Sequence, residues 1–362
     1  MIPIDFDRLH GIGLTAELYR RACLCADTSD GALHLERITS VHRETLQTHD
    51  GRAAGAARPQ PRLLRRLQGE GTLLAVGDWV LVAVDPAGAR WVHERVPPVS
   101  HIARRDGDGS RHPVVSNVDA ALLVMGLDDD FNLRRLERYL TLAHGGNVTP
   151  YVVLTKADIA AADPALRDAR LTALACRLSA DVRTIVVDAT DPASAAAFAG
   201  VTGAGRTVVL LGSSGAGKST LTNTLLGVQV QDTGAVRAHD SRGMHTTTAR
   251  SLHRLPGGGC VIDTPGLRAL RPDIDEQTLT ASFADVEAFA AKCRFRDCSH
   301  GDEPGCAVRA GVDPDRLRNF QKLLRETRRD ALTWVERRGQ LSAWKSRGKE
   351  TRARMQMKRG ER

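Results

Sequence analysis

Two hydrophobic patterns divide the chain. Between residues 35 and 105, short apolar runs such as WVLVAV at 79–84 are separated by turn residues such as DPAG at 85–88. Several short strands with turns between them are typical of a small barrel, so we expect an all-β domain over 35–105. Residues 1–34 show no clear pattern. We expect them to form an N-terminal extension whose first part is poorly ordered.

Continuous apolar runs alternate with helical segments in the middle of the chain. Runs such as ALLVM at 121–125 and TVVLL at 207–211 are typical of parallel strands buried on both faces. Leu133, Leu136 and Leu140 are spaced as on one face of a helix, which Gly145 and Gly146 would end. The alternation predicts a doubly wound α/β domain over 106–285, with a Gly- and Asp-rich linker at its start over 104–113.

The remaining residues, 286–362, combine a Cys/His cluster with polar, helix-forming sequence. From residue 325 onward there are 13 Lys and Arg against 5 Asp and Glu. We therefore predict a third, zinc-binding domain with a basic helical tail, which makes the protein multidomain.

Composition and charge narrow the class of protein. The chain has 362 residues, 42% of them hydrophobic, which is enough for two or three packed domains. A formal net charge of +8 favours a polyanionic partner, with nucleic acid ahead of membrane. The N-terminus does not read as a signal peptide, and no apolar run approaches the roughly 18 residues of a membrane span. We expect a cytoplasmic protein with no membrane partner.

The strongest motif is the phosphate-binding loop GSSGAGKS at 212–219, which fits GxxxxGK[ST] between a predicted strand and a predicted helix. Its backbone N–H groups can surround phosphate oxygens beside the positive end of the helix. We expect Lys218 to contact the β- and γ-phosphates and to act in catalysis, and Ser219 to bind Mg²⁺. The nucleotide-binding residues expected in this loop are Gly212, Ser213, Ser214, Gly215, Ala216, Gly217, Lys218, Ser219 and Thr220.

Two further motifs suggest guanine rather than adenine. Thr155-Lys156-Ala157-Asp158 follows an apolar run, and the carboxylate of Asp158 can accept hydrogen bonds from guanine that adenine does not offer. DTPG follows the run CVI, which puts Asp263 near Mg²⁺ and the Gly266 N–H near the γ-phosphate. A second base-contacting loop is expected at Asp188-Ala189-Thr190.

The order of these motifs is circularly permuted, because the guanine-reading motif precedes the phosphate loop. Between that loop and DTPG lies SRGMHTTTAR, a candidate switch. We favour Thr247, over Thr246 and Thr248, as the residue that closes over Mg²⁺. After DTPG stands Leu267, which cannot orient water, so we hypothesise that His245 polarises the attacking water.

Cysteines 293, 298 and 306 and His300 form one cluster within 14 residues. Three thiolates and one imidazole suit tetrahedral Zn²⁺, and four protein ligands leave no open position. We predict a structural zinc site formed by Cys293, Cys298, His300 and Cys306.

Taken together, the segments VGDWV, TKAD, GSSGAGKSTLTN, HTTT and DTPGLR and the Cys/His cluster resemble the circularly permuted, ribosome small-subunit-dependent GTPases of the RsgA family. The resemblance implies an OB-fold barrel, a permuted GTPase domain and a zinc domain. It further implies binding to the small ribosomal subunit in late assembly, with GTP hydrolysis stimulated there.

RNA contact is expected at the basic segment 58–66, which we interpret as a loop, and along the basic tail with Trp334 and Trp344. We expect a monomer whose ligands are GTP or GDP and whose partner is the small subunit with its rRNA. Two alternatives are open: an ATP-dependent kinase or transporter-type ATPase, which Asp158 disfavours, and an RNA-binding zinc module with a mainly structural nucleotide site.

Overall fold

The computed structural model describes residues 4–26, 33–42, 45–105, 111–229, 250–266 and 271–331. It divides into two compact units, Met1–Asp273 and Ile274–Arg362. Each unit is considered by itself. No helix in these described ranges is both long and apolar enough to cross a lipid bilayer.

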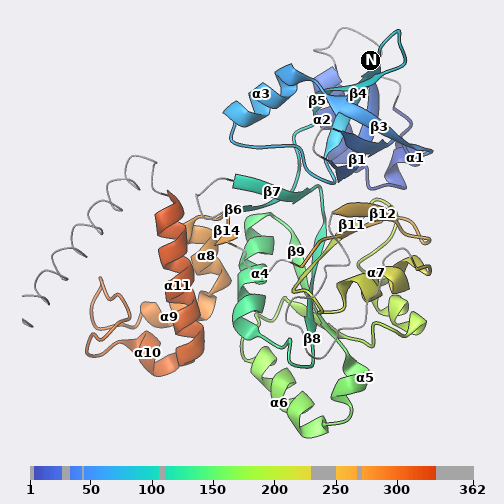
Figure 1. The fold of residues 1–362 in the computed structure, drawn as a ribbon. Helices are drawn as coiled ribbons and strands as arrows, with labels where there is room; N and C mark the ends of the chain where they lie inside the picture. Colours follow the sequence, from blue (N-terminus) through green and yellow to red (C-terminus); the bar gives the residue numbers. More distant parts are fainter. Residues whose placement is uncertain are drawn as a thin grey trace, which may run out of the picture. The chain divides into compact units, whose positions relative to one another are not determined.

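The first unit contains a closed ring of five strands (Figure 1). Neighbours around the ring pair in the order β1–β2–β3–β5–β4, and β4 pairs back onto β1. Leu46, Val80, Val82 and Val92 lie buried in one cluster inside this ring. The predicted small barrel is thus present. Its strands are β1 (His34–Val41), β2 (Leu46–His49), β3 (Ala54–Pro59), β4 (Trp79–Val84) and β5 (Arg90–Arg95).

Two helices precede the barrel, α1 (Phe6–His10) and α2 (Ala16–Ala26). Leu9, Leu14 and Leu18 are buried and belong to the same core cluster as Trp79 of the barrel. The expectation of poor order is therefore wrong for residues 4–26, because the spacing of these leucines buries them against the barrel's outer surface.

We predicted a loop for the basic segment 58–66, and this prediction is wrong. The segment covers the end of β3 and most of helix α3 (Pro61–Gly69), which begins with proline in its first turn. Leu63 and Leu67, four residues apart, are both buried and close one side of the barrel interior. The arginines between them face outward because they occupy the opposite side of the helix.

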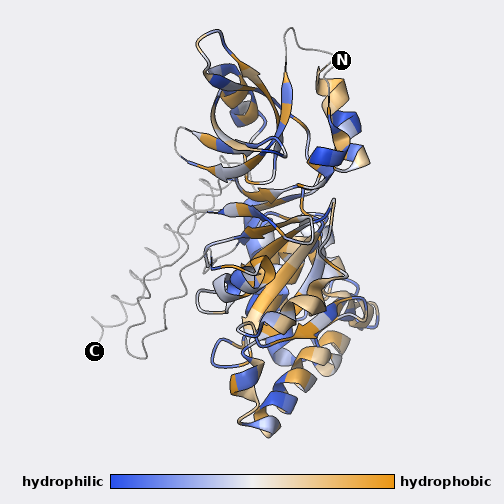
Figure 2. Cartoon of the chain, turned by 90° about the vertical axis from the view of Figure 1, so that its right-hand side faces the viewer, coloured by the Kyte–Doolittle hydropathy of each residue, from blue (hydrophilic) through white to orange (hydrophobic). Residues whose placement is uncertain are grey.

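The α/β part of the first unit contributes six strands, in the order β10-β9-β8-β11-β13-β12, to a sheet that continues into the barrel where β12 pairs with β1. The first five strands are parallel and β12 is antiparallel. Figure 2 shows these strands as largely hydrophobic, in agreement with burial on both faces. The predicted α/β alternation is confirmed. The strands are β8 (Ala120–Gly126), β9 (Thr149–Thr155), β10 (Arg183–Val186), β11 (Thr207–Gly212), β12 (Ser251–Arg254) and β13 (Cys260–Asp263).

Helical segments connect these strands. The helix predicted after residue 132 is α4 (Leu133–Gly145), which Asn132 caps at its start and Gly146 at its end. The other helical segments are α5 (Ala157–Ala160), α6 (Pro164–Ala175), η1 (Pro192–Phe198) and α7 (Lys218–Leu226).

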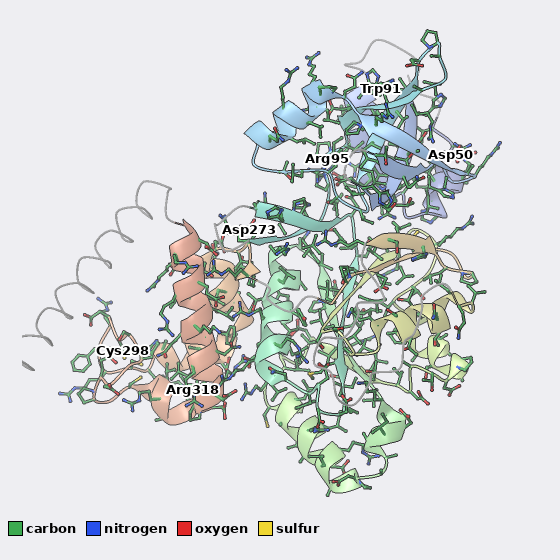
Figure 3. All side chains as sticks on the ribbon, viewed as in Figure 1. Asp50, Trp91, Arg95, Asp273, Cys298 and Arg318 are labelled. Carbon is green, nitrogen blue, oxygen red and sulfur yellow. The ribbon has the colours of Figure 1, made fainter. Side chains whose placement is uncertain are left out.

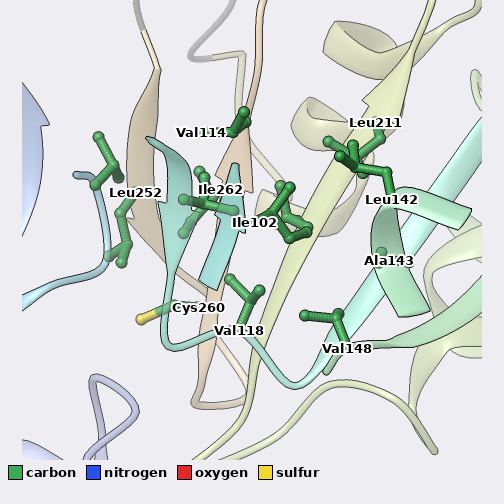
Figure 4. Close-up of a cluster of buried hydrophobic side chains, with 14 of the residues drawn as sticks. Ile102, Val114, Val118, Leu142, Ala143, Val148, Leu211, Leu252, Cys260 and Ile262 are labelled. Carbon is green, nitrogen blue, oxygen red and sulfur yellow. The ribbon is translucent and has the colours of Figure 1, made fainter. Parts of the chain in front are cut away.

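The segment that we predicted as a linker over 104–113 is instead part of a hairpin. Strands β6 (His101–Arg105) and β7 (Arg111–Ser116) pair with each other, and β14 (Arg271–Pro272) pairs with β6. Ile102 and Val114 of this hairpin enter a buried cluster that includes Leu142 and Ile262 (Figure 4). Consecutive buried residues, Ile102 and Ala103 in β6 and the last four residues of β7, explain why these segments form strands despite the Gly- and Asp-rich sequence between them.

The buried side chain of Arg37 connects three parts of the first unit. From β1 its guanidinium donates to the carbonyl oxygens of Ile12, Gly77 and Asn117 and to Oγ1 of Thr207, at 2.5–3.3 Å. Thr207 is the first residue of β11. The barrel is therefore bonded directly to the strand that carries the phosphate loop.

The second unit is helical within its described part, which ends at residue 331. Phe283 and Phe320 pack at a ring-centroid distance of 5.3 Å in its core. Arg316 and Asp285 form an ion pair beside them. The helices are α8 (Glu276–Ser282), α9 (Ala284–Ala290), α10 (Ala307–Gly311) and α11 (Pro314–Ala331). Residues 325–331 of the basic tail belong to α11, and the rest of the tail, with Trp334 and Trp344, lies outside the described residues.

Candidate functional site

The predicted phosphate loop, Gly212–Ser219, connects β11 to α7. Gly217 precedes the helix with φ of +90°, a backbone conformation that disfavours any side chain. A left-handed residue at this point turns the chain directly into the first helical N–H groups. The loop therefore ends at a helix N-terminus, as a phosphate cradle requires.

Lys218 is the first residue of α7 and is buried within the loop. Its Nζ donates to the carbonyl oxygen of Ser213 at 2.6 Å. Burial lowers the pKa of Lys218 to about 8, although the charges of Asp263 and Asp130 oppose that shift. A desolvated ammonium group inside a ring of backbone N–H groups is well suited to bind an anion such as a phosphate.

The DTPG turn lies against this loop. Asp263 ends β13 and is fully buried, and Thr264 Oγ1 donates to the carbonyl oxygen of Leu210 at 2.6 Å. A Cβ added to Gly266 would lie 2.5 Å from the backbone nitrogen of Ser214, so only glycine permits this approach. The carboxylate of Asp263 and the hydroxyl of Ser219 offer the oxygen ligands that Mg²⁺ prefers.

Strand β9 brings the predicted guanine-reading motif to the phosphate loop. The Oγ1 of buried Thr155 donates to the carbonyl oxygen of Ala216 at 2.7 Å. Lys156 follows with φ of +60° as the N-cap of α5, and Asp158 lies exposed in the first turn of that helix. The two motifs, far apart in the sequence, are in direct contact.

The second predicted base loop lies beside the first. Val187 donates its backbone N–H to Leu154 at 2.9 Å, and the carbonyl oxygen of Ala189 accepts from Thr224 Oγ1 of α7 at 2.6 Å. Oδ1 of Asp188 accepts from the side chain and the backbone of Thr190, which holds the pKa of Asp188 below its ordinary value. Asp188 thus closes its own turn.

Two aspartates at the site were missed in the sequence. Asp130 Oδ1 accepts from Ser213 Oγ at 2.5 Å and forms an ion pair with Arg135. Asp128 accepts from Nζ of Lys156 at 2.6 Å. The acidic run after β8 was the available signal, since the carboxyl ends of parallel strands meet at one edge of a sheet.

The predicted switch residues lie outside the described residues. These are His245 and Thr247, together with Thr246, Thr248 and Leu267.

The Cys/His cluster comes together in the second unit, where Figure 3 labels Cys298. The four ligand atoms of Cys293, Cys298, His300 and Cys306 lie within 4.8 Å of one another. Cys293 Sγ is 3.7 Å from Nδ1 of His300 and 4.0 Å from Sγ of Cys306. Zinc–sulfur bonds of about 2.3 Å would separate tetrahedral ligands by roughly 3.8 Å, so the set fits one Zn²⁺.

The thiol of Cys293 is prepared for metal binding. Backbone N–H groups of Val308 and Ala307, at the start of α10, lower the pKa of Cys293. Those N–H groups favour the thiolate, which is the form that binds metal. His300 adopts a left-handed φ of +59°, and Gln321 of α11 donates to its carbonyl oxygen.

Comparison with known proteins agrees with this geometry. The family model for RsgA GTPase matches residues 95–272. The small ribosomal subunit biogenesis GTPase RsgA of Xanthomonas campestris pv. campestris (strain B100) is 42% identical over 340 residues, covering 92% of this chain and 85% of the relative. The protein of the same name from Xanthomonas oryzae pv. oryzae (strain MAFF 311018) is 43% identical with the same coverage.

Two solved structures share the fold. YjeQ from Thermotoga maritima has a TM-score of 0.56 and 22% identity, with 82% of this chain and 98% of that chain covered. YloQ, described as a circularly permuted GTPase, has a TM-score of 0.57 and 21% identity, with 85% and 99% covered. The sequence identity over nearly the whole chain, together with the circularly permuted order of the motifs, shows that the chain belongs to the RsgA family of GTPases.

Proposed function

We propose that this GTPase binds the small ribosomal subunit and hydrolyses GTP late in subunit assembly, with turnover stimulated by the subunit. The relatives that cover 92% of the chain are named for small-subunit biogenesis. The contact between Thr155 and Ala216 carries the nucleotide part of the proposal, because it joins a guanine reader to a phosphate loop. We take the GTP- or GDP-bound protein to act as a cytoplasmic monomer.

Each site residue has a proposed role. Asp158 accepts from the guanine base, and Lys156 lies along it. Lys218 and the loop 212–220 bind the phosphates, and Gly266 senses the γ-phosphate. Ser219 binds Mg²⁺, with Asp263 beside it and Thr247 closing from the switch. The barrel, as an OB-fold, and the basic tail contact rRNA.

The zinc centre has a structural role in this proposal. Its four ligands lie in the segment that joins the end of α9 to the start of α10. When bound, Zn²⁺ would fix that segment as one rigid surface. The protein's own residues contribute the thiolates and the imidazole orientation that this requires.

Nucleotide turnover with and without purified small subunits tests the proposal. We expect GTP to be hydrolysed in preference to ATP, and the rate to rise when subunits are added. Cosedimentation with subunits should depend on the bound nucleotide. Turnover that small subunits leave unchanged would instead favour an RNA-binding zinc module whose nucleotide site is mainly structural.

His245 is the proposed water-polarising residue, because Leu267 cannot perform this role. The variant His245→Ala should lose most of the subunit-stimulated rate while it still binds subunits and GTP. A near-normal stimulated kcat in this variant would reject His245 as the catalytic group without affecting the rest of the proposal.

A further inference from the structure

An open pocket of about 470 Å³ lies on the outside of the barrel, where β4, β5 and the start of α3 meet. This volume falls in the range of roughly 300–1,000 Å³ that small-molecule groups occupy. Pro61, Val84 and Trp91 supply its apolar lining, and Gln60, Asp85 and His93 supply polar atoms. The pocket is separate from the nucleotide site, and the proposed roles above do not use it.

Trp91 is on the outer side of β5, whereas Val92 next to it is completely buried in the barrel (Figure 3). The barrel's other tryptophan, Trp79, is fully buried in the core. The indole Nε1 of Trp91 donates to Asp85 Oδ2 at 3.0 Å. Asp85 also accepts from the backbone N–H groups of Ala87 and Ala89. The ring is therefore held by its edge in a fixed orientation while it lines an open pocket.

Polar atoms suited to a base edge also line this pocket. The backbone of Gln60 is bonded to Val92, and its side-chain Nε2 donates to Nε2 of His93 at 3.0 Å. The side-chain oxygen of Gln60 accepts no hydrogen bond from any residue in the described ranges. An amide and an imidazole can together donate to and accept from the edge of a heterocycle.

The positively charged residues around the pocket favour a polymer that carries phosphates. Arg58 is opposite Trp91 in the β3–β5 register, and Arg62 and Arg65 are on α3. All three are exposed, and within the described ranges none is ion-paired. Their neighbours Arg66 and Arg90, in contrast, are neutralised by Glu94 and Glu36. A fixed aromatic ring beside unpaired arginines suits a base attached to phosphates.

We propose that this pocket binds one unpaired nucleobase of single-stranded RNA, which stacks on Trp91 and is bonded at its edge by Gln60 and His93. Arg58, Arg62 and Arg65 bind the phosphates on either side. The inference rests on the proposed function, since rRNA would supply the strand. The barrel thereby distinguishes unpaired RNA from a duplex, whose bases are already stacked.

The test uses the full chain and a fluorescein-labelled single-stranded RNA of about eight nucleotides, a length typical for one OB-fold. Fluorescence anisotropy should show binding that Trp91→Ala weakens about tenfold and that Trp91→Phe restores to within about threefold. Phe295→Ala, at an exposed aromatic residue of the second unit, is the matched control and should leave affinity unchanged. Binding of a duplex should not differ between wild type and Trp91→Ala.

Tryptophan fluorescence adds a direct readout. RNA should quench part of the wild-type emission, and Trp91→Phe should lose that part while it still binds. The proposal would be overturned if the wild type did not bind the single-stranded RNA. It would also be overturned if the wild type and a folded Trp91→Ala variant bound this RNA with equal affinity. Subunit cosedimentation and GTP turnover of the wild type decide the proposed function separately, because neither depends on the oligonucleotide result.

Discussion

Lys218 carries its charge where water hardly reaches it, and this has a measurable consequence at the scale of one residue. Burial lowers its pKa to about 8 in the folded protein, against an ordinary value of 10.5. Between these two pH values the Lys218 amine is protonated to a greater extent in the unfolded chain than in the folded protein. Stability should therefore rise with pH across this window, and the full penalty should apply below pH 8.

The variant Lys218→Met removes that penalty. Without nucleotide at pH 7, we expect it to be more stable than the wild type by up to about 3 kcal/mol, and the difference should disappear towards pH 10.5. Urea unfolding at both pH values measures this. Saturating Mg²⁺–GTP should reverse the order, because phosphates favour the ammonium form. A wild type that is the more stable protein without ligand would contradict the assignment.

A second prediction concerns Asp158 and the choice of nucleotide. The carboxylate of Asp158 is exposed at the start of α5, where a guanine edge can reach it. In Asp158→Asn, an amide that can donate replaces one acceptor, so GTP should bind roughly 30-fold more weakly, from a loss of about 2 kcal/mol. Xanthosine triphosphate, which presents a carbonyl at that edge, should gain affinity. Titration with both nucleotides checks the exchange, and Asp163→Asn, at the cap of α6, is the control.

At the scale of elements, the motifs could be predicted and their contacts could not. The phosphate loop can be predicted because its glycines and Lys218 all stand in one short, contiguous segment of the sequence. The contacts of Asp128 with Lys156 and of Asp130 with Ser213 depend on which strands are neighbours. Hydrophobic periodicity carries no information on that order.

Helix α3 was missed for a different reason. The segment is rich in basic residues, contains a proline and has no side-chain hydrogen bond at its N-cap, all of which are typical of a loop. The i, i+4 spacing of Leu63 and Leu67 was the signal for a helix. Charged residues dominated the pattern because the helix is short and only one side of it is buried.

The zinc cluster allows a prediction for the whole second unit. Its core is small, and Cys293, Cys298 and Cys306 lie within or against it. The variant Cys306→Ser should lose bound zinc and lower the melting temperature of this unit, since metal-binding energy is also folding energy. Metal content and calorimetry measure the two effects. Cys176→Ser, at an exposed cysteine of the first unit, should change neither. Full zinc occupancy in Cys306→Ser would disprove the ligand set.

At the scale of the first unit, Arg37 holds the barrel, the N-terminal segment and β11 together. Arg37→Met keeps the bulk of the side chain but leaves four acceptors without their donor. We expect a loss of about 3 kcal/mol in the free energy of unfolding. Arg20→Met, at a side chain that is 73% exposed, should change stability by less than about 0.5 kcal/mol. Equal effects of the two variants would mean that Arg37 does not connect these parts.

The position of β11 in the sheet also sets an order of events during synthesis. Strands β8, β9 and β10 are neighbours and leave the ribosome before β11 and β13, so the half of the site proposed to read the base can assemble early. Strand β11 needs β8 on one side and β13 on the other. The phosphate cradle therefore acquires its second wall only after residue 263 has been made. A nascent chain released before that point would hold a base reader without a functioning phosphate site, and so could not compete for GTP with finished copies.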